Sequence, residues 1–361
     1  MSTVNPCYIL GLETSADDTA AAIVEVHSRR ILGQAIRTQM AEHAAYGGSV
    51  TELASRAHQA HLPALVQETF TQAELTIADI HAIATTTGPG LTTALAMGAT
   101  FGKTLALARG LPFLATNHIE GHALSPLLAE GSALPKAFLQ RHEPYVLLLI
   151  TGGHTQLIAV RDVGHYELLG TTADDAVGEC FDKIGAALNL PHPSGPNLAK
   201  LAAQGNPHGV ILPSPKGAGV FDFSFSGLKT AARQAVEKGS TSPASISPAA
   251  ISPADIAASL EHTIATLLAD KLGKTLAHTG IKHAVAAGGV AANSTIRAAL
   301  QQACTIKGCS FTAPPLALCT DNAAMIAYAG GLRWQNGLTK GEGLAAPLYP
   351  RWPLSDMNSS H

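Results

Sequence analysis

Short apolar runs alternate with tight turns along the chain, and two of these patterns stand at corresponding places in the two halves. Residues 8–26 comprise an apolar run, the turn Glu13-Thr14-Ser15 and a second apolar run. Residues 145–160 repeat this order around the turn Thr151-Gly152-Gly153-His154-Thr155. Each segment predicts two strands whose turn exposes backbone amides. The repetition indicates a duplicated α/β unit with a ligand held between the halves, and chance repetition is the alternative.

Two further glycine turns each follow a short apolar run and precede a helix-like segment. The run Ile80–Thr87 predicts a strand, after which Gly88-Pro89-Gly90 leads into a helix over 91–108. The run Ala284–Ala287 is followed by Gly288-Gly289 and another helix. A glycine turn at a helix start can present free amides to an anion, and paired glycines let a nucleotide approach the backbone. A plain strand-to-helix turn is the alternative at Gly88-Pro89-Gly90.

The later part of the chain contains one segment without periodicity. Residues 238–253 are rich in Ser, Ala and Pro, which predicts a flexible surface insertion. Asp255 is expected to cap a long helix that ends near Gly280. The residues after Pro353 are expected to form a loose tail.

Length and composition restrict the protein class. A chain of 361 residues predicts two lobes of roughly 100 to 200 residues each. Hydrophobic residues make up 46% and charged residues 14%, which fits a compact fold and excludes extensive disorder. The start has no basic region, and no window approaches the roughly 20 apolar residues of a spanning helix, so we expect neither a signal peptide nor a membrane span.

Cysteine usage and charge narrow the setting further. The five cysteines are odd in number and form no C-x-x-C pair, which argues against a disulfide framework or a zinc ribbon. A cytoplasmic location is therefore expected. The formal charge of -3 gives no electrostatic signature of nucleic-acid binding. Binding of any nucleic acid would therefore have to depend on a local basic patch or on partner proteins.

His118 and His122 have the spacing of two metal ligands on one helix. Residues four apart lie one turn apart on a common face, with Cβ atoms about 6 Å apart, so both imidazoles can bind one ion at about 2.1 Å. The chain has 16 histidines, so pairs at this spacing also arise by chance. The zinc-protease motif H-E-x-x-H has a Glu directly after its first His. Ile119 stands there in this chain, and Glu120 is expected to point away from the ligand face.

Six strings along the chain resemble, in the same order, the motifs of the universal tRNA threonylcarbamoyladenosine transferase family. The resemblance covers roughly residues 8–353. The strings are Gly11-Leu12-Glu13-Thr14-Ser15, Asn117-His118-Ile119-Glu120-Gly121-His122, Thr151-Gly152-Gly153-His154-Thr155-Gln156-Leu157, Gly178-Glu179-Cys180-Phe181-Asp182-Lys183, Phe223-Ser224-Phe225-Ser226-Gly227-Leu228-Lys229 and Cys319-Thr320-Asp321-Asn322.

The resemblance implies an α/β fold of two ribonuclease H-like lobes, of the actin, hexokinase and sugar kinase-like ATPase type, with the active site in the interlobe cleft. We expect the first lobe, with the metal-binding helix, over residues 1–140. The second lobe, with the nucleotide-binding glycine turns, is expected over 141–345. A C-terminal tail is expected over 346–361.

The resemblance also implies two binding sites. Two imidazoles and a carboxylate would hold one divalent metal ion, Fe(2+) by resemblance, with zinc as the alternative because this ligand set suits both ions. Asp182 would bind a ribose hydroxyl in the adenylate site, although it could instead be a surface acid, Asn293 a helix N-cap and Gly195 part of a turn. The metal ligands are His118, His122 and Asp321, and the adenylate-site residues are Leu149, Ile150, Thr151, Gly152, Gly153, Asp182, Gly195 and Asn293.

The implied reaction is an acyl transfer to tRNA. The threonylcarbamoyl group would move from threonylcarbamoyl-AMP to the exocyclic amine of the adenosine 3′ of the anticodon, in tRNAs that read codons beginning with A, and AMP would leave. Asp17 and Asp18 are candidates for orienting the threonyl part or accepting the proton. Backbone amides of 13–15 and 151–153 are candidates for the phosphate. Family members usually carry Cys and Glu where this chain has Ala16 and Asp18, which leaves the role of Asp18 open.

The resemblance implies two partner subunits, a degenerate paralogue and a small ATPase. Other functions remain as alternatives. One is a metalloprotease, because the family was once assigned as a sialoglycoprotein endopeptidase. Another is an ATPase or kinase on the same fold, which predicts a magnesium-binding acid and needs no histidine pair. A non-catalytic scaffold is the third.

Overall fold

The structure is a computed structural model that describes residues 5–39, 50–129, 131–191, 193–214, 219–241, 251–339 and 343–358. The chain divides into two compact units. Unit 1 comprises 1–142, 160–167 and 314–361, and unit 2 comprises 143–159 and 168–313. The chain forms two five-stranded sheets, one in unit 1 and one mainly in unit 2. The end of β7 (Thr155–Asp162) and the start of β8 (His165–Thr171), within residues 160–167, are counted with unit 1 although they belong to the second sheet.

The sheet of unit 1 has the strand order β3-β2-β1-β4-β5. The first three strands form an antiparallel meander, whereas β4 and β5 extend the sheet in parallel to β1. Strands β1 and β4 are buried almost throughout, as expected for strands with both faces covered. The strands are β1 (Tyr8–Glu13), β2 (Asp18–Glu25), β3 (Arg30–Thr38), β4 (Ala82–Gly88) and β5 (Phe113–Asn117).

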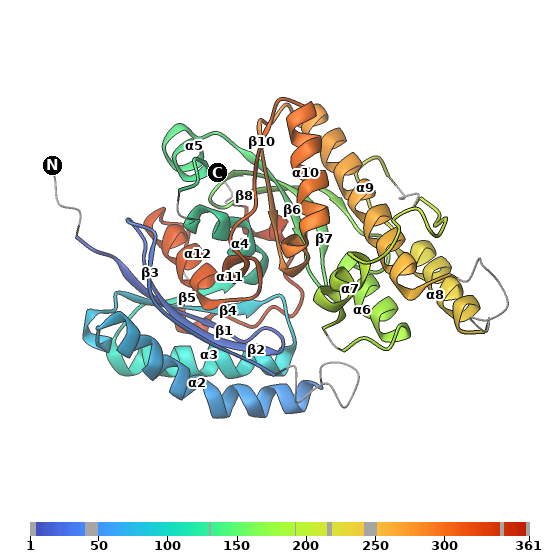
Figure 1. Ribbon diagram of the computed structural model, residues 1–361. Helices are drawn as coiled ribbons and strands as arrows, with labels where there is room; N and C mark the ends of the chain where they lie inside the picture. The colour runs from blue at the N-terminus through green and yellow to red at the C-terminus, as the bar shows by residue number, and fades with distance from the viewer. Residues whose placement is uncertain are drawn as a thin grey trace. The chain divides into compact units, whose positions relative to one another are not determined.

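Helices cover both faces of this sheet (Figure 1). Helices α2 (Thr51–Ala73) and α3 (Thr92–Arg109) pack against one face, and α12 (Ala323–Gln335) packs against the other. The small residues of α12 allow close packing, since a Cβ atom added at Gly330 would lie 2.7 Å from that of Ala84. The shorter elements of unit 1 are α4 (His118–Leu124), α5 (Leu134–Arg141), α11 (Leu316–Cys319), η1 (Ile77–Asp79), η2 (Ser125–Leu128), η4 (Gly343–Ala345) and η5 (Leu354–Met357).

The sheet of unit 2 repeats this topology. Its order is β10-β9-β6-β7-β8. The first strand, β6, therefore lies between β7, the next strand along the chain, and β9, which follows a long connection, just as β1 lies between β2 and β4. Strands β9 and β10 extend the sheet in parallel to β6. The matching order in two halves confirms the predicted duplication. The strands are β6 (Tyr145–Ile150), β7 (Thr155–Asp162), β8 (His165–Thr171), β9 (His283–Ala287) and β10 (Ser310–Thr312).

The helices of unit 2 pack around α9 (Pro253–Thr279), which contacts three of the others. Their order in the chain places α6 and α7 after the meander and α10 after β9. They are α6 (Val177–Ala187), α7 (Ser194–Ala202), α8 (Ser226–Thr241), α10 (Ser294–Ile306) and the short η3 (Gly289–Ala292).

The division of the chain differs from the expected lobes at its C-terminal end. We expected the second lobe to continue to residue 345, but unit 1 resumes at Pro314. The physical reason is α12, which is buried along most of its length against β1, β2, β4 and β5. A helix that is apolar on all sides carries no sign in its sequence of which sheet it covers.

Three local predictions need correction. Ser252, not Asp255, caps α9, because the Ser252 side chain accepts from the Asp255 amide, while the Asp255 carboxylate accepts from the Asn206 amide at 2.7 Å. The helix does end at Gly280, as expected. Residues up to Thr241 of the expected insertion belong to α8, and 242–250 lie outside the described residues. The expected loose tail instead forms η5, whose Leu354 and Met357 are buried, although 359–361 lie outside the described residues.

None of the five cysteines forms a disulfide in the structure. Among the described residues, no helix has both the length and the apolar character needed to cross a membrane.

Candidate functional site

The helix α4 begins at His118, directly after β5 ends at Asn117. Asn117 is the N-cap, and its side-chain oxygen accepts from the Ile119 amide at 2.8 Å and from the Glu120 amide at 3.2 Å. This cap satisfies two amides that a helix start leaves without partners. His118 and His122 therefore face the same way, one turn apart, as the spacing predicts.

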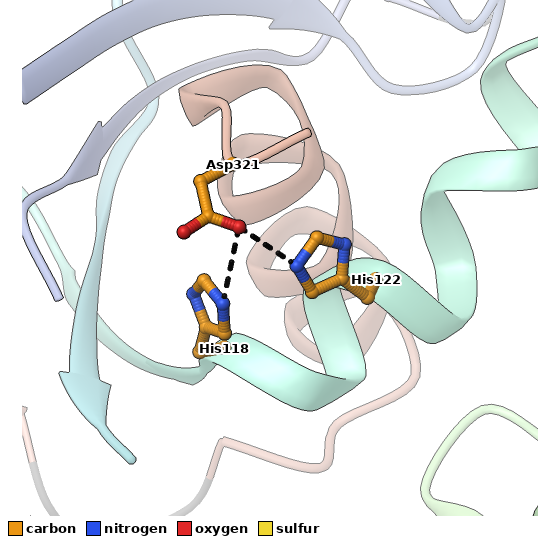
Figure 2. A group of neighbouring side chains, drawn as sticks. All are labelled: His118, His122 and Asp321. Carbon is orange, nitrogen blue, oxygen red and sulfur yellow. Dashed lines mark hydrogen bonds and ion pairs between the residues drawn. The ribbon is translucent and has the colours of Figure 1, made fainter. Parts of the chain in front are cut away.

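Asp321 meets both histidines (Figure 2). Its Oδ1 atom lies 3.0 Å from Nε2 of His122 and 3.5 Å from Nε2 of His118. Asp321 stands just before α12, whose N-cap Asn322 accepts from the Met325 amide at 2.9 Å. Because α12 packs directly against α4, the three side chains converge within unit 1 although about 200 residues separate them.

This group has the composition of a site for a divalent transition metal. One donor atom of each residue lies within 4.8 Å of the others, and both histidines are buried. Two imidazoles and one carboxylate suit iron or zinc. Nδ1 of His122 has no hydrogen-bond partner among the described atoms. The polar contact that the structure shows for this buried ring is the one between Nε2 and Asp321. The residues present therefore fit a metal ion bound between the two Nε2 atoms and Asp321.

Glu13 supports this group from the other side of His118. Its Oε2 atom lies 3.0 Å from Nδ1 of His118 and accepts from the Thr86 hydroxyl at 2.5 Å. The Ser15 hydroxyl is also 3.2 Å from Nδ1 of His118. A carboxylate on the far nitrogen of a ligating histidine fixes the tautomer and the ring orientation. This role of Glu13 was not predicted from the sequence, although a carboxylate at the end of a buried strand is expected to have a polar or charged partner.

The two carboxylates make the site strongly attractive to a cation. Burial would lower the pKa of His118, but Asp321 and Glu13 outweigh it and raise that pKa well above its usual value. Burial would raise the pKa of Asp321 and of Glu13, yet the neighbouring His118 lowers both, that of Asp321 far below its usual range. A metal ion would take the place of the proton on His118, so its binding would release a proton.

The turn between β1 and β2 holds the other two carboxylates named from the sequence. Asp17 and Asp18 are both partly buried there. Desolvation raises the pKa of Asp18 to about 6, against the opposing hydrogen bond from Thr38, and nearby carboxylates including Asp321 add to the rise. A carboxyl group with a pKa near neutrality can exchange a proton at physiological pH.

One expected phosphate contact is contradicted at this turn. The Ser15 amide does not face outward but donates to Oε1 of Glu13 at 2.5 Å. A phosphate at 13–15 would also meet the buried Glu13 carboxylate. The Ser15 amide therefore belongs to the histidine site and does not face a phosphate.

In unit 2, three glycine segments meet at the carboxyl ends of β6 and β9. A Cβ atom added at Gly288, where φ is +95°, would clash with the Ile150 carbonyl, and one added at Gly178 would lie 2.6 Å from the Thr151 carbonyl. Gly152 and Gly153 have open space around them. The carboxyl end of a parallel sheet is where α/β folds bind ligands. Leu149 and Ile150 are buried in β6 and position this turn.

The remaining predicted adenylate-site residues have local structural contacts. Oδ1 of Asp182 accepts from the Ser194 amide at 2.8 Å, which ties α6 to the start of α7, where Gly195 lies. Asn293 caps α10 by accepting from the Ile296 amide at 2.9 Å, and its Nδ2 donates to Glu261 at 2.5 Å. The N-cap alternative for Asn293 is thus present. The binding roles of these three residues stay predictions.

Comparison with known sequences identifies the family. Residues 30–328 match the family described as tRNA N6-adenosine threonylcarbamoyltransferase. The chain belongs to this family. Proteins of that name from Granulibacter bethesdensis and Brucella anthropi are 48% and 46% identical to it, over 97% of this chain and 94% and 96% of their own. The protein of that name from Rhizobium meliloti is 47% identical, over 96% of this chain and 95% of its own.

Solved structures of other proteins confirm the fold of this family member. Full-length HypF in its phosphate- and nucleotide-bound form matches 93% of the chain with a TM-score of 0.58 at 12% identity, over 47% of its own length. The activator of 2-hydroxyisocaproyl-CoA dehydratase from Clostridium difficile matches 93% with a TM-score of 0.50 at 12% identity, over 98% of its own length. These likenesses show the actin and hexokinase-like fold expected from the sequence.

Glu120 cannot act as the base that the protease alternative requires. Glu120 lies on the other side of α4, where Oε1 accepts from the Tyr166 hydroxyl at 2.7 Å and from Arg333 at 3.0 Å. A carboxylate paired in this way, and fully buried, is not placed to activate water beside His118 and His122.

Proposed function

We propose that this protein transfers a threonylcarbamoyl group from threonylcarbamoyl-AMP to the exocyclic amine of the adenosine 3′ of the anticodon, in tRNAs that read codons beginning with A, with release of AMP. The protein is then a metal-dependent acyltransferase. Membership of the family supports the reaction. The observation that carries the metal-dependent part is the convergence of His118, His122 and Asp321 in one buried group.

The metal ion is proposed to be Fe(2+), with zinc as the alternative. When bound, it would supply Lewis-acid stabilisation of developing negative charge, an effect worth several kcal/mol. His118, His122 and Asp321 would hold it, and Glu13 would keep the His118 ring in place. The ligand set fits both ions, so a metal measurement has to choose between them.

The chain's own groups have to position a weak nucleophile and accept its proton. The adenine amine is a poor nucleophile because its lone pair is delocalised into the ring. We assign Asp18, with its pKa near 6, as the better candidate for accepting the proton, and Asp17 as the candidate for orienting the threonyl part. Positioning of the two reactants would supply much of the remaining rate.

The adenylate is proposed to bind at the glycine turn of unit 2. Gly152 and Gly153 are exposed, and the space around them would let a phosphate approach their backbone. Asp182, Gly195 and Asn293 are the further candidates, Asp182 for a ribose hydroxyl.

The partners are proposed from the family resemblance. They are tRNA, a degenerate paralogue and a small ATPase, and the location is proposed to be the cytoplasm. The net charge of -3 supports a need for partners, because phosphate contacts normally supply most of the affinity for nucleic acid.

Mass analysis of nucleosides tests the proposal. The purified chain is combined with the paralogue and small ATPase subunits proposed above, incubated with unmodified tRNA, threonylcarbamoyl-AMP and Fe(2+), and the tRNA is then digested. We expect adenosine that carries an added threonylcarbamoyl mass, and a large loss of this product in His118→Ala, His122→Ala and Asp321→Ala. An unchanged nucleoside profile would contradict the reaction, and equal product from the three variants would remove the metal from it.

A further inference from the structure

A fully buried histidine outside the metal centre, His58, contacts the turn 15–18. His58 lies in α2, the helix that packs against β2 and β3 (Figure 1), and its side chain is fully buried. Its Nε2 atom is 2.9 Å from the Ala16 carbonyl oxygen. Its Nδ1 atom is 2.7 Å from the Thr19 hydroxyl and 3.2 Å from the Gln39 side-chain amide. Because a carbonyl only accepts, the proton lies on Nε2 and Nδ1 is the acceptor.

The turn that His58 contacts connects the metal centre to the candidate proton acceptor. At one end, Ser15 places its hydroxyl 3.2 Å from Nδ1 of His118. At the other end stand Asp17 and Asp18, each with a partly buried side chain. Ala16 lies between these two ends and has only a methyl side chain, so its backbone carbonyl is the group by which the turn can be held.

Backbone contacts hold the two ends of the turn, and His58 holds its middle residue, Ala16. The Leu91 amide donates to the Ser15 carbonyl at 2.9 Å, and the Gln39 amide donates to the Asp17 carbonyl at 3.2 Å. Between them, His58 donates from α2 to the Ala16 carbonyl. The carbonyls of Ser15, Ala16 and Asp17 are therefore each bound by a different segment of unit 1. Together these three contacts define the position of the turn.

A purely packing role does not explain the choice of residue. A leucine would fill a similar volume in the interior of α2 without the cost of desolvating two ring nitrogens. Both nitrogens of His58 have partners, of which Ala16 belongs to the turn and Thr19 directly follows it. Small displacements of reacting groups are costly, since a misplacement of about 1 Å can lower a rate by roughly 100-fold.

We propose that His58 is a positioning residue for the transfer reaction, because it holds the Ala16 carbonyl and thereby places Ser15 against His118 and Asp17 and Asp18 at the site. This inference rests on the proposed function. It predicts that loss of the His58 hydrogen bond lowers the rate of transfer without removing the metal ligands.

Three variants separate positioning from stability. His58→Leu removes the hydrogen bond, and His58→Gln keeps a donor near the place of Nε2. Thr69→Val is the matched control, because Thr69 is also a buried polar residue of α2 and its hydroxyl contacts the Ala21 carbonyl of β2 at 3.2 Å, away from the turn. Each variant is measured for kcat and KM with threonylcarbamoyl-AMP and tRNA, for bound metal, for Tm, and for hydrogen exchange of the peptide 13–20.

We expect His58→Leu to lower kcat at least ~10-fold with KM nearly unchanged, to keep its metal, and to exchange faster in the peptide 13–20. His58→Gln is expected to recover most of the rate, and Thr69→Val to lower Tm without these effects. If kcat falls in Thr69→Val as much as in His58→Leu, or if exchange of the peptide does not change, the proposal is wrong. If the wild-type protein transfers nothing while exchange increases in His58→Leu alone, the anchoring of the turn is supported and the proposed function fails.

Discussion

Glu13 is the residue outside the three proposed ligands that contributes most to the metal centre. Its carboxylate lies at 3.0 Å from Nδ1 of His118, is fully buried, and also accepts from the Thr86 hydroxyl and the Ser15 amide. Such a partner orients the imidazole and increases its basicity as a ligand. The charge of Glu13, and not only its hydrogen-bonding capacity, should therefore influence metal affinity.

The substitution Glu13→Gln tests this charge. Glutamine keeps one oxygen, which can still accept from the Thr86 hydroxyl, but it removes the negative charge beside His118 and the oxygen that accepts from the Ser15 amide. We expect a ~10- to 100-fold loss of metal affinity, measured by competition with a chelator. Glu25→Gln is the control, because Glu25 is also a buried carboxylate at the end of a strand and accepts from the Cys7, His27 and Ser28 amides. Glu25→Gln likewise loses the charge and one accepting oxygen. Equal affinities in the two variants would contradict the role of Glu13.

Asp18 should make stability depend on pH. Its pKa is raised from 3.8 to about 6, mainly by desolvation, so between these values the unfolded chain loses the proton while the folded chain keeps it. Stability then falls as the pH rises through this window. Below pH 4, the free energy of unfolding of Asp18→Asn should equal that of wild type. At pH 7, it should be higher than that of wild type by up to roughly 3 kcal/mol. Urea unfolding at both pH values measures this, and a variant no more stable at pH 7 would refute the assignment.

At the scale of elements, the strands and glycine turns were predictable, whereas the N-cap of α9 was not. The apolar runs correctly placed β1, β2, β6, β7 and β9, because a buried strand needs a short run of apolar residues wherever it lies. The cap of α9 was assigned to Asp255 because Ser252 and Asp255 are both good capping residues. Only the backbone angles at Ser252, which are extended, decide between them.

Two glycines at the carboxyl end of the second sheet, Gly288 and Gly153, differ in their surroundings: a Cβ atom would clash at the first and would meet open space at the second. Gly288→Ala should lower the free energy of unfolding by about 1–3 kcal/mol, because its φ of +95° and the nearby Ile150 carbonyl leave no room for a Cβ atom. Gly153→Ala meets open space and should leave that free energy within about 0.5 kcal/mol of wild type. If the turn binds the adenylate, Gly153→Ala should nevertheless weaken AMP binding. Calorimetry on both variants measures affinity, and unchanged affinity in Gly153→Ala would place the phosphate elsewhere.

At the scale of the whole molecule, the sequence indicated the duplication but not where the chain returns. Two matching strand-turn-strand patterns predicted two related sheets, and both sheets have the same order. The return of 314–361 to unit 1 was not predictable, because α12 is apolar on nearly every side. Because the position of α12 was not predictable, the contact of Asp321 with the histidine pair was expected from the family resemblance and not from the spacing of residues in the sequence. Glu13 was missed because 105 residues separate it from His118 and no local pattern links them.

Metal content per chain is the most direct test of the central claim, that His118, His122 and Asp321 together bind one ion. The wild-type protein and the variants His122→Ala, Asp321→Ala and His262→Ala are loaded with Fe(2+) or Zn(2+), desalted and analysed by plasma mass spectrometry. His262 is the control, because its ring also faces another histidine, His208, at 5.0 Å. We predict about one ion per chain in wild type and His262→Ala, and a large loss in the other two. Undiminished metal in His122→Ala and Asp321→Ala would contradict the account.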